Sequence, residues 1–226
     1  MREIVLDTET TGLDPDDGHR IAEIAAVELM NHVPTGRVFH RYINPQRLMP
    51  DAALAVHGLS DEFLAQHAPF DAVVDEFLVF IGGDRLVIHN ASFDLRFINA
   101  ELARLERPAL SVPFEDTLTL ARRRYPGAPA SLDALCKRFA IDNSARDKHG
   151  ARLDCELLAS VYLELIGGRQ PGFDLAASRL GGAAGAMLAR PMRPPRHFAP
   201  SIAELARHVA FLAKLKAPIW LESDRL

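Results

Sequence analysis

The spacing of apolar and polar residues predicts three β-strands at the start of the chain. Residues 4–10 and 21–29 are mostly apolar, and in residues 37–43 Val38, His40 and Tyr42 alternate with Phe39, Arg41 and Ile43. Turn-forming residues fill positions 11–18, and Asn44-Pro45 ends the third stretch. The short connections between the stretches predict an antiparallel meander.

After Leu59 the period of the apolar pattern changes from that of strands to that of helices. Ser60 precedes a short helix start, and residues 85–89 form a short apolar stretch that predicts a buried strand. Longer helices are predicted over residues 71–81, 93–105, 115–124, 131–139 and 151–166. Three strands followed by helix-strand-helix units predict an α/β fold, with a mixed sheet flanked by helices.

Charge divides the chain into two regions. The net charge is −4 over 226 residues, but residues 1–175 carry 18 Lys+Arg and 27 Asp+Glu, whereas residues 176–226 carry 8 and 3. An acidic main domain does not suit a protein that coats duplex DNA, but it suits a carboxylate-rich metal site that holds a short phosphate chain.

Composition also bounds the cellular setting. No apolar run approaches the ~20 residues of a membrane span, and the chain begins with a strand, not with a basic-then-apolar signal. Cys136 and Cys155 are too few for a disulfide framework. We therefore expect a reduced, cytoplasmic setting and no membrane partner.

Two carboxylates interrupt the first apolar stretch. Asp7 and Glu9 are alternate residues, so on a strand they share one face, roughly 7 Å apart. Carboxylates in an apolar run are costly unless a cation or hydrogen-bond donors compensate them. The sequence therefore indicates a metal site here, and the alternative is that the strand ends at Leu6 and a turn begins at Asp7.

Two further aspartates begin predicted helices. On a helical wheel of residues 151–166, Asp154 falls in the middle of the apolar stripe, which predicts an inward-facing carboxylate and favours a ligand. The alternative is favourable contact with the helix dipole. Asp94 follows the strand at residues 85–89, at the end of the sheet where ligands commonly bind. Ser92 and Asp94 also make an ordinary helix start.

His149 lies five residues before Asp154, in the polar loop that precedes the last long helix. A loop histidine is commonly just a solvated side chain. Beside a metal cluster, however, an imidazole is able to take a proton from water near pH 7. His149 is therefore the candidate general base.

Three motifs together resemble the DEDDh 3′→5′ exonucleases, and within them the proofreading (epsilon) subunits of bacterial DNA polymerase III. The motifs are Asp7-x-Glu9 followed by Thr10-Thr11-Gly12-Leu13, then His89-Asn90-Ala91-x-Phe93-Asp94, and then His149-x4-Asp154. Their order and placement match over about residues 3–166. The resemblance implies a ribonuclease H-like fold over residues 1–168.

The resemblance also implies roles for individual residues. Asp7, Glu9, Asp94 and Asp154 would hold two divalent cations, Mg²⁺ or Mn²⁺, and His149 would activate water. All-oxygen ligation selects hard cations over zinc. Residues that would contact the terminal nucleotide are Thr10, Thr11, Gly12, Leu13, Asp51, Val56, His57, Leu59, Asn90 and Phe93.

The resemblance extends past the predicted nuclease domain. Residues 169–176, with Gln170, Phe173 and Leu175, are similar to a sliding-clamp-binding peptide, and residues 177–200 suit a linker because they are rich in Ala, Gly, Arg and Pro. Residues 201–226 look like a polymerase-binding tail, in which Leu205, Val209, Leu212 and Trp220 are the expected contacts. The alternative is that this tail docks back on residues 1–166.

The expected function is removal of mismatched 3′-terminal nucleotides as 5′-monophosphates, from single-stranded or frayed DNA. Two alternatives remain open from the sequence. The catalytic motifs do not separate DNA from RNA, so the chain could be an exoribonuclease of the same family. It could also be a polymerase-bound scaffold without activity, although the complete set of carboxylates and His149 counts against this.

Overall fold

In the computed structural model, five strands form one mixed sheet in the order β3-β2-β1-β4-β5. The structure describes residues 1–144, 148–168 and 199–215. The strands are β1 (Arg2–Thr10), β2 (Ile21–Met30), β3 (Val33–Tyr42), β4 (Arg85–Ile88) and β5 (Phe114–Asp116). The first three are antiparallel neighbours, whereas β4 is parallel to both β1 and β5. The predicted meander and mixed sheet are confirmed.

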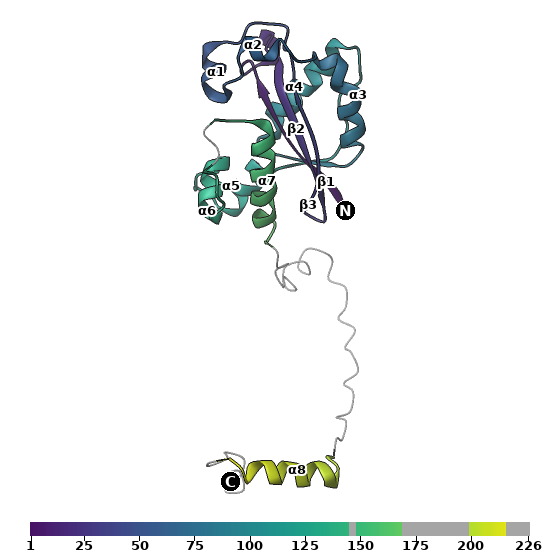
Figure 1. Cartoon of the computed structure of the whole chain (residues 1–226), viewed down its shortest axis with the longest axis vertical. Helices are drawn as coiled ribbons and strands as arrows, with labels where there is room; N and C mark the ends of the chain where they lie inside the picture. The colour runs from purple at the N-terminus through teal and green to yellow at the C-terminus, as the bar shows by residue number, and fades with distance from the viewer. Residues whose placement is uncertain (145–147, 169–198, 216–226) are drawn as a thin grey trace, which may run out of the picture. The chain divides into compact units, whose positions relative to one another are not determined.

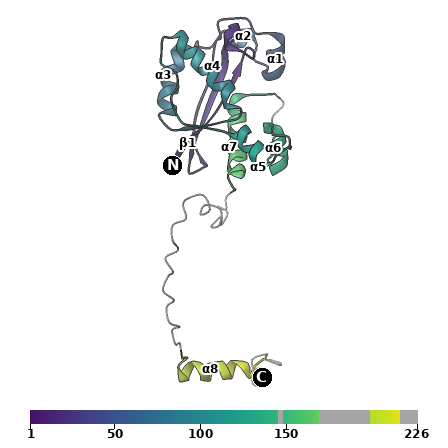
Figure 2. The same ribbon diagram turned by 180° about the vertical axis from the view of Figure 1, so that it is seen from behind.

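Helices lie on both faces of this sheet (Figures 1 and 2). Their bounds are α1 (Asp51–His57), α2 (Asp61–Leu64), α3 (Phe70–Ile81), α4 (Ala91–Arg104), α5 (Thr117–Arg124), α6 (Leu132–Phe139) and α7 (Ala151–Leu165), and Pro15–Asp17 forms a 3-10 turn, η1. Each predicted helix is present, with ends that differ by at most two residues.

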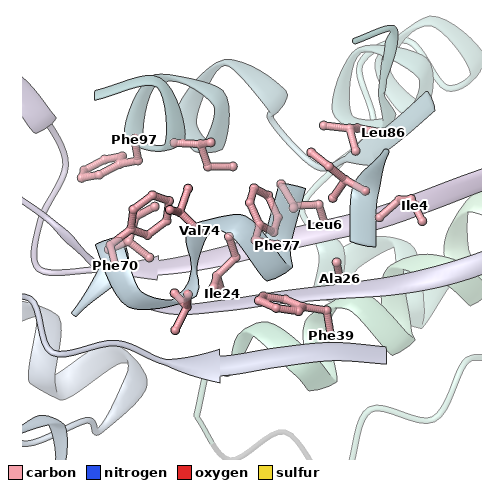
Figure 3. Close-up of a cluster of buried hydrophobic side chains, with 14 of the residues drawn as sticks. Ile4, Leu6, Ile24, Ala26, Phe39, Phe70, Val74, Phe77, Leu86 and Phe97 are labelled. Carbon is pink, nitrogen blue, oxygen red and sulfur yellow. The ribbon is translucent and has the colours of Figure 1, made fainter. Parts of the chain in front are cut away.

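The two faces of the sheet bury separate hydrophobic cores. Ile4 and Leu6 of β1 pack with residues of α3 and α4, such as Phe77 and Phe97 (Figure 3). Val5, between them in sequence, points to the other core, which contains α5, α6 and α7. This alternation follows from the two-residue period of a strand.

Two elements differ from the prediction. The predicted helix at residues 115–124 starts two residues late, because Phe114–Asp116 pairs with β4 as a strand. Asp116 then caps α5 by accepting a hydrogen bond from the Leu118 amide. Helix α1 was not predicted, since its N-cap is Pro50, which provides no side-chain cap.

The described residues fall into two units, one within residues 1–175 and the other within residues 176–226. In the second unit, α8 (Ile202–Leu212) begins with a capping box in which Ser201 and Glu204 each bond the other's backbone. None of the helices in the described residues could cross a membrane. The predicted clamp peptide, most of the linker and Trp220 lie outside the described residues.

Candidate active site

The first turn of α7 packs across β1 and β2 and brings Asp154 to the sheet. The Cys155 thiol lies 3.7 Å from the carbonyl oxygen of Val5 and 3.4 Å from that of Ala25. Asp7 pairs with Ala25 in the antiparallel ladder and shares the α7 face with Val5. Asp154 is only 4% exposed, as the helical wheel predicts for an inward-facing residue.

Glu9, His149 and Asp154 gather at the carboxyl end of β1. One ligand atom from each lies within 4.8 Å of the others. His149 Nδ1 is 3.5 Å from Asp154 Oδ2, and its backbone N–H donates to the carbonyl of Val56 in α1 over 3.2 Å. The hydrogen bond to Val56 fixes the loop before α7, while the His149 side chain stays 48% exposed to solvent.

Asp94 reaches the same site from the first turn of α4. It is 3% exposed, and its Oδ1 accepts a hydrogen bond of 2.7 Å from Thr8 Oγ1. Because β1 and β4 are parallel, their carboxyl ends meet at one edge of the sheet. The structure therefore brings the four predicted carboxylates and the predicted base to one edge.

Burial raises the pKa values of Asp7 and Asp94. Loss of solvation raises the pKa of Asp7 well above its ordinary value, and the charges of Asp94, Glu9 and Asp154 raise it further. Burial raises the pKa of Asp94 to about 7, although the Thr8 hydrogen bond acts in the opposite direction. Four carboxylates and one histidine make up this set. Divalent cations fit it, because their charge would offset the repulsion between the carboxylates.

A cavity of about 610 Å³ opens beside Glu9. Its lining includes seven of the residues predicted to contact a nucleotide: Thr10, Thr11, Gly12, Leu13, Val56, His57 and Phe93. Leu13 is 83% exposed, and His57 is 6% exposed. Burial lowers the pKa of His57, and its Nδ1 accepts a hydrogen bond from the Leu59 amide, so the neutral ring carries its proton on Nε2.

Three predicted nucleotide contacts do not line this cavity. Asp51 is exposed at the start of α1, and Leu59 packs against the small core of Ala22, Met49 and Leu64. Asn90 adopts a left-handed conformation (φ 71°) before α4, and its N–H donates to Asp116.

The sequence did not indicate His19, although its ring lines the cavity wall. The His19 Nδ1 is 3.1 Å from Thr11 Oγ1. A Cβ on Gly12 would lie 2.3 Å from the His19 ring, so a larger residue at this position would displace that ring. His19 follows a stretch of turn-forming residues, and nothing in its spacing separates it from an ordinary loop histidine.

A second cavity, of about 430 Å³, opens on Asp7, His149 and Asp154. The rest of its lining comes from His89, from Leu118 and Arg122 of α5, and from residues 131–133 at the start of α6. Apart from His89, which belongs to a predicted motif, none of these residues could be predicted from the sequence, because only the packing of α5 and α6 brings them to the site.

Comparison with known proteins places the chain among exonucleases. The family model described as "Exonuclease" (RNase_T) matches residues 4–162. The DNA polymerase III subunit epsilon of Rickettsia felis is 54% identical over 179 residues, which cover 77% of this chain and 78% of that protein. The Escherichia coli subunit of the same name is 48% identical over 176 residues, covering 74% and 72%.

Solved structures agree. Exonuclease X in complex with 5′ overhanging duplex DNA matches with a TM-score of 0.59 and 26% identity, over 73% of this chain and 90% of that one. The nuclease domain of 3′hExo, a DEDDh family member bound to rAMP, matches with a TM-score of 0.62 and 16% identity, over 73% and 91%. Because its sequence identity is only 16%, the match to 3′hExo supports the fold alone.

Proposed function

The chain belongs to the exonuclease family that contains the epsilon subunits of DNA polymerase III, and from this we propose that it proofreads DNA. It removes mismatched nucleotides from DNA 3′ ends as 5′-monophosphates, within a polymerase III assembly. The observation that carries the proposal is the meeting of four carboxylates and His149 beside a cavity of about 610 Å³.

Asp7, Glu9, Asp94 and Asp154 would hold two divalent cations, Mg²⁺ or Mn²⁺. When bound, such ions neutralise charge on the phosphate and lower the pKa of water. His149 takes the proton from the attacking water, and Asp154, whose Oδ2 lies 3.5 Å from Nδ1, orients the imidazole. The exposed side chain of His149 can exchange that proton with solvent.

The first cavity binds the 3′-terminal nucleoside. Residues 10–12 line it along the end of β1, and the apolar side chains of Val56 and Phe93 provide contacts for the base and sugar. Leu13, at 83% exposure, packs against the terminal base at the rim. A mismatched end frays at a smaller cost of unstacking, so unpaired ends enter this cavity preferentially.

Substitution of Asp7 tests the assignment. Asp7→Ala removes the carboxylate that lies close enough to the other three to feel the charge of each. Metal-dependent release of mononucleotides from a mismatched primer should therefore fall to background. Thermal unfolding of the variant provides the control for folding. Full activity of the purified Asp7→Ala protein would exclude this site, and release of mononucleotides by the parent would exclude the scaffold alternative.

An exoribonuclease of the same family would have the same catalytic residues, so the choice of substrate distinguishes it from the proposed DNA exonuclease. Matched single-stranded DNA and RNA oligonucleotides with Mg²⁺ should be hydrolysed with a preference for DNA. We expect DNA because the curated relatives are DNA polymerase subunits. Faster hydrolysis of the RNA oligonucleotide would favour the alternative.

The tail supplies the proposed polymerase contact. Leu205 and Val209 of α8 are 49% and 64% exposed, which suits a helix that binds a partner through its apolar side. Gln170, Phe173 and Leu175 are the proposed clamp contacts, and Trp220 is a further polymerase contact. A pull-down with the cognate polymerase subunit and clamp, using chains that end at Gly168 and at Leu226, tests both interactions.

A further inference from the structure

The second cavity, of about 430 Å³, has no role in the function proposed above. It shares no lining residue with the first cavity, yet both open on the carboxylates. Glu9 lines the first cavity, whereas Asp7 and Asp154 line the second. The carboxylate cluster therefore lies between two separate spaces.

Arg122 is the arginine of the second cavity, and its guanidinium is free to bind an anion. Among the residues that the structure describes, it forms no ion pair and no hydrogen bond, although it lines the same cavity as Asp7 and Asp154. Two positions further along α5, Arg124 instead donates to the Leu165 carbonyl over 2.6 Å. An exposed guanidinium offers five donors in a planar fork, which suits a phosphate.

A hydrogen-bonded chain fixes α5 to the end of β4. Thr117 Oγ1 donates to the Ile88 carbonyl over 3.2 Å, and His89 Nδ1 lies 2.9 Å from the same hydroxyl. Since the Thr117 hydroxyl has one hydrogen, His89 Nδ1 is the donor in the second bond. Burial lowers the pKa of His89, although a hydrogen bond to the Ala130 backbone acts in the opposite direction. Arg122 thus projects from a helix whose start is anchored beside the active site.

We propose that the second cavity binds the phosphodiester on the 5′ side of the scissile bond, and that Arg122 contacts its phosphate. The inference rests on the proposed function. With the terminal nucleoside in the first cavity and the scissile phosphate at the carboxylates, the preceding nucleotide needs a separate space that adjoins the same carboxylates. The second cavity meets this requirement and supplies a free cation for the next phosphate.

Two substrates separate this role from catalysis. The p-nitrophenyl ester of thymidine 5′-monophosphate has a terminal nucleoside and a scissile phosphate but no preceding phosphodiester, whereas a short single-stranded DNA has all three. Arg122→Ala should lower kcat/KM on the DNA by about tenfold and leave hydrolysis of the ester within about twofold. Arg123→Ala is the matched control, because Arg123 is exposed on the same helix and does not line the cavity.

A neutral methylphosphonate at the second linkage from the 3′ end tests the contact itself. It should lower kcat/KM of the parent to the level of Arg122→Ala and have little further effect on that variant, as expected for one shared interaction. The salt dependence of kcat/KM on DNA should also become shallower in Arg122→Ala, by about 0.7 in the log–log slope.

Three outcomes would decide against the proposal. Equal losses on the ester and on DNA would place Arg122 at the scissile phosphate. Equal losses in Arg122→Ala and Arg123→Ala would reduce the effect to general charge, and additive effects of the methylphosphonate and Arg122→Ala would exclude a shared contact. Failure of the unsubstituted protein to hydrolyse either substrate would instead contradict the proposed nuclease function.

Discussion

At the residue scale, Asp94 shows how a carboxylate of the proposed metal site destabilises the metal-free protein. Burial raises its pKa to about 7 from an ordinary value of 3.8, so the folded chain holds this proton more tightly than the unfolded chain. The free energy of unfolding of the metal-free protein therefore loses a contribution from Asp94 as pH rises from about 4 to about 7. Above that range the full cost of the buried charge remains.

Asp94→Asn should stabilise the metal-free protein at pH 8, by on the order of 2 kcal/mol, because it removes the buried charge and keeps an acceptor for Thr8. The gain should shrink as pH falls toward about 4, and activity should be lost. Urea unfolding in the presence of EDTA at several pH values measures this gain in the free energy of unfolding.

Asp116→Asn is the control for this experiment, since the pKa of Asp116 is lowered by its hydrogen bonds to Thr119 and to backbone amides. Its contribution to stability is present above the ordinary pKa and is lost on acidification, so Asp116→Asn should not stabilise at pH 8. A gain for Asp94→Asn that does not change with pH would contradict a raised pKa.

His149 is predicted to act on the rate rather than on binding. His149→Gln removes the base but keeps a polar side chain, so kcat on single-stranded DNA should fall by about 100-fold or more while KM changes by less than about threefold. The His149 backbone hydrogen bond to Val56 does not involve the side chain and should persist. A rise in KM that matches the loss of kcat would argue for a binding role instead.

At the scale of elements, Arg20 and Glu101 hold the start of β2 against α4. Arg20 Nε and Nη2 donate to the two carboxylate oxygens of Glu101 over 2.6 and 2.7 Å, and the Glu101 side chain is 2% exposed. Arg20→Ala would remove both short hydrogen bonds and leave the buried carboxylate with only the longer contacts to Arg104 and to the Ile21 amide, each 3.4 Å. We expect a loss of about 3 kcal/mol in the free energy of unfolding.

Arg41 and Glu76 provide the matched comparison. Arg41 Nη2 contacts both oxygens of Glu76 over 2.6 and 2.7 Å, but the side chains are 42% and 57% exposed. Arg41→Ala should cost less than about 1 kcal/mol, because water screens this pair and replaces it. Equal losses in the two variants would show that burial does not set the strength of the Arg20 contact.

The sequence predicted those helices and strands that are long enough for the pattern of apolar residues to define a buried face. Asp154 could be placed correctly because the apolar stripe of a helix of 15 residues fixes which way each side chain points. The strand β5 has three residues, two of them acidic, and exists because β4 offers a partner edge. Arg122 reaches the site only through packing between distant segments, which no local pattern encodes. His19 reaches it through the turn that follows β1, where its ring lies against Thr11 and Gly12.

At the scale of the whole molecule, residues 1–175 are acidic and residues 176–226 are basic, which suits the proposed division between catalysis in the first unit and attachment to the polymerase in the second. The carboxylates, His149 and both cavities all belong to the first unit. In the second unit, the α8 helix of 11 residues exposes Ile202, Leu205 and Val209. A helix this short is marginal in water by itself, so its apolar side chains favour a partner.

Leu205→Ser with Val209→Ser should therefore weaken binding to the polymerase catalytic subunit by about 100-fold or more and leave hydrolysis of single-stranded DNA unchanged. These two side chains lie one turn apart on one side of α8, whereas Arg207 lies on the opposite side and Arg207→Ser serves as the control. Surface plasmon resonance with the immobilised polymerase subunit measures the affinity. Loss of nuclease activity together with binding would show that the tail supports the catalytic unit directly, and equal weakening by Arg207→Ser would remove the apolar side of α8 as the contact.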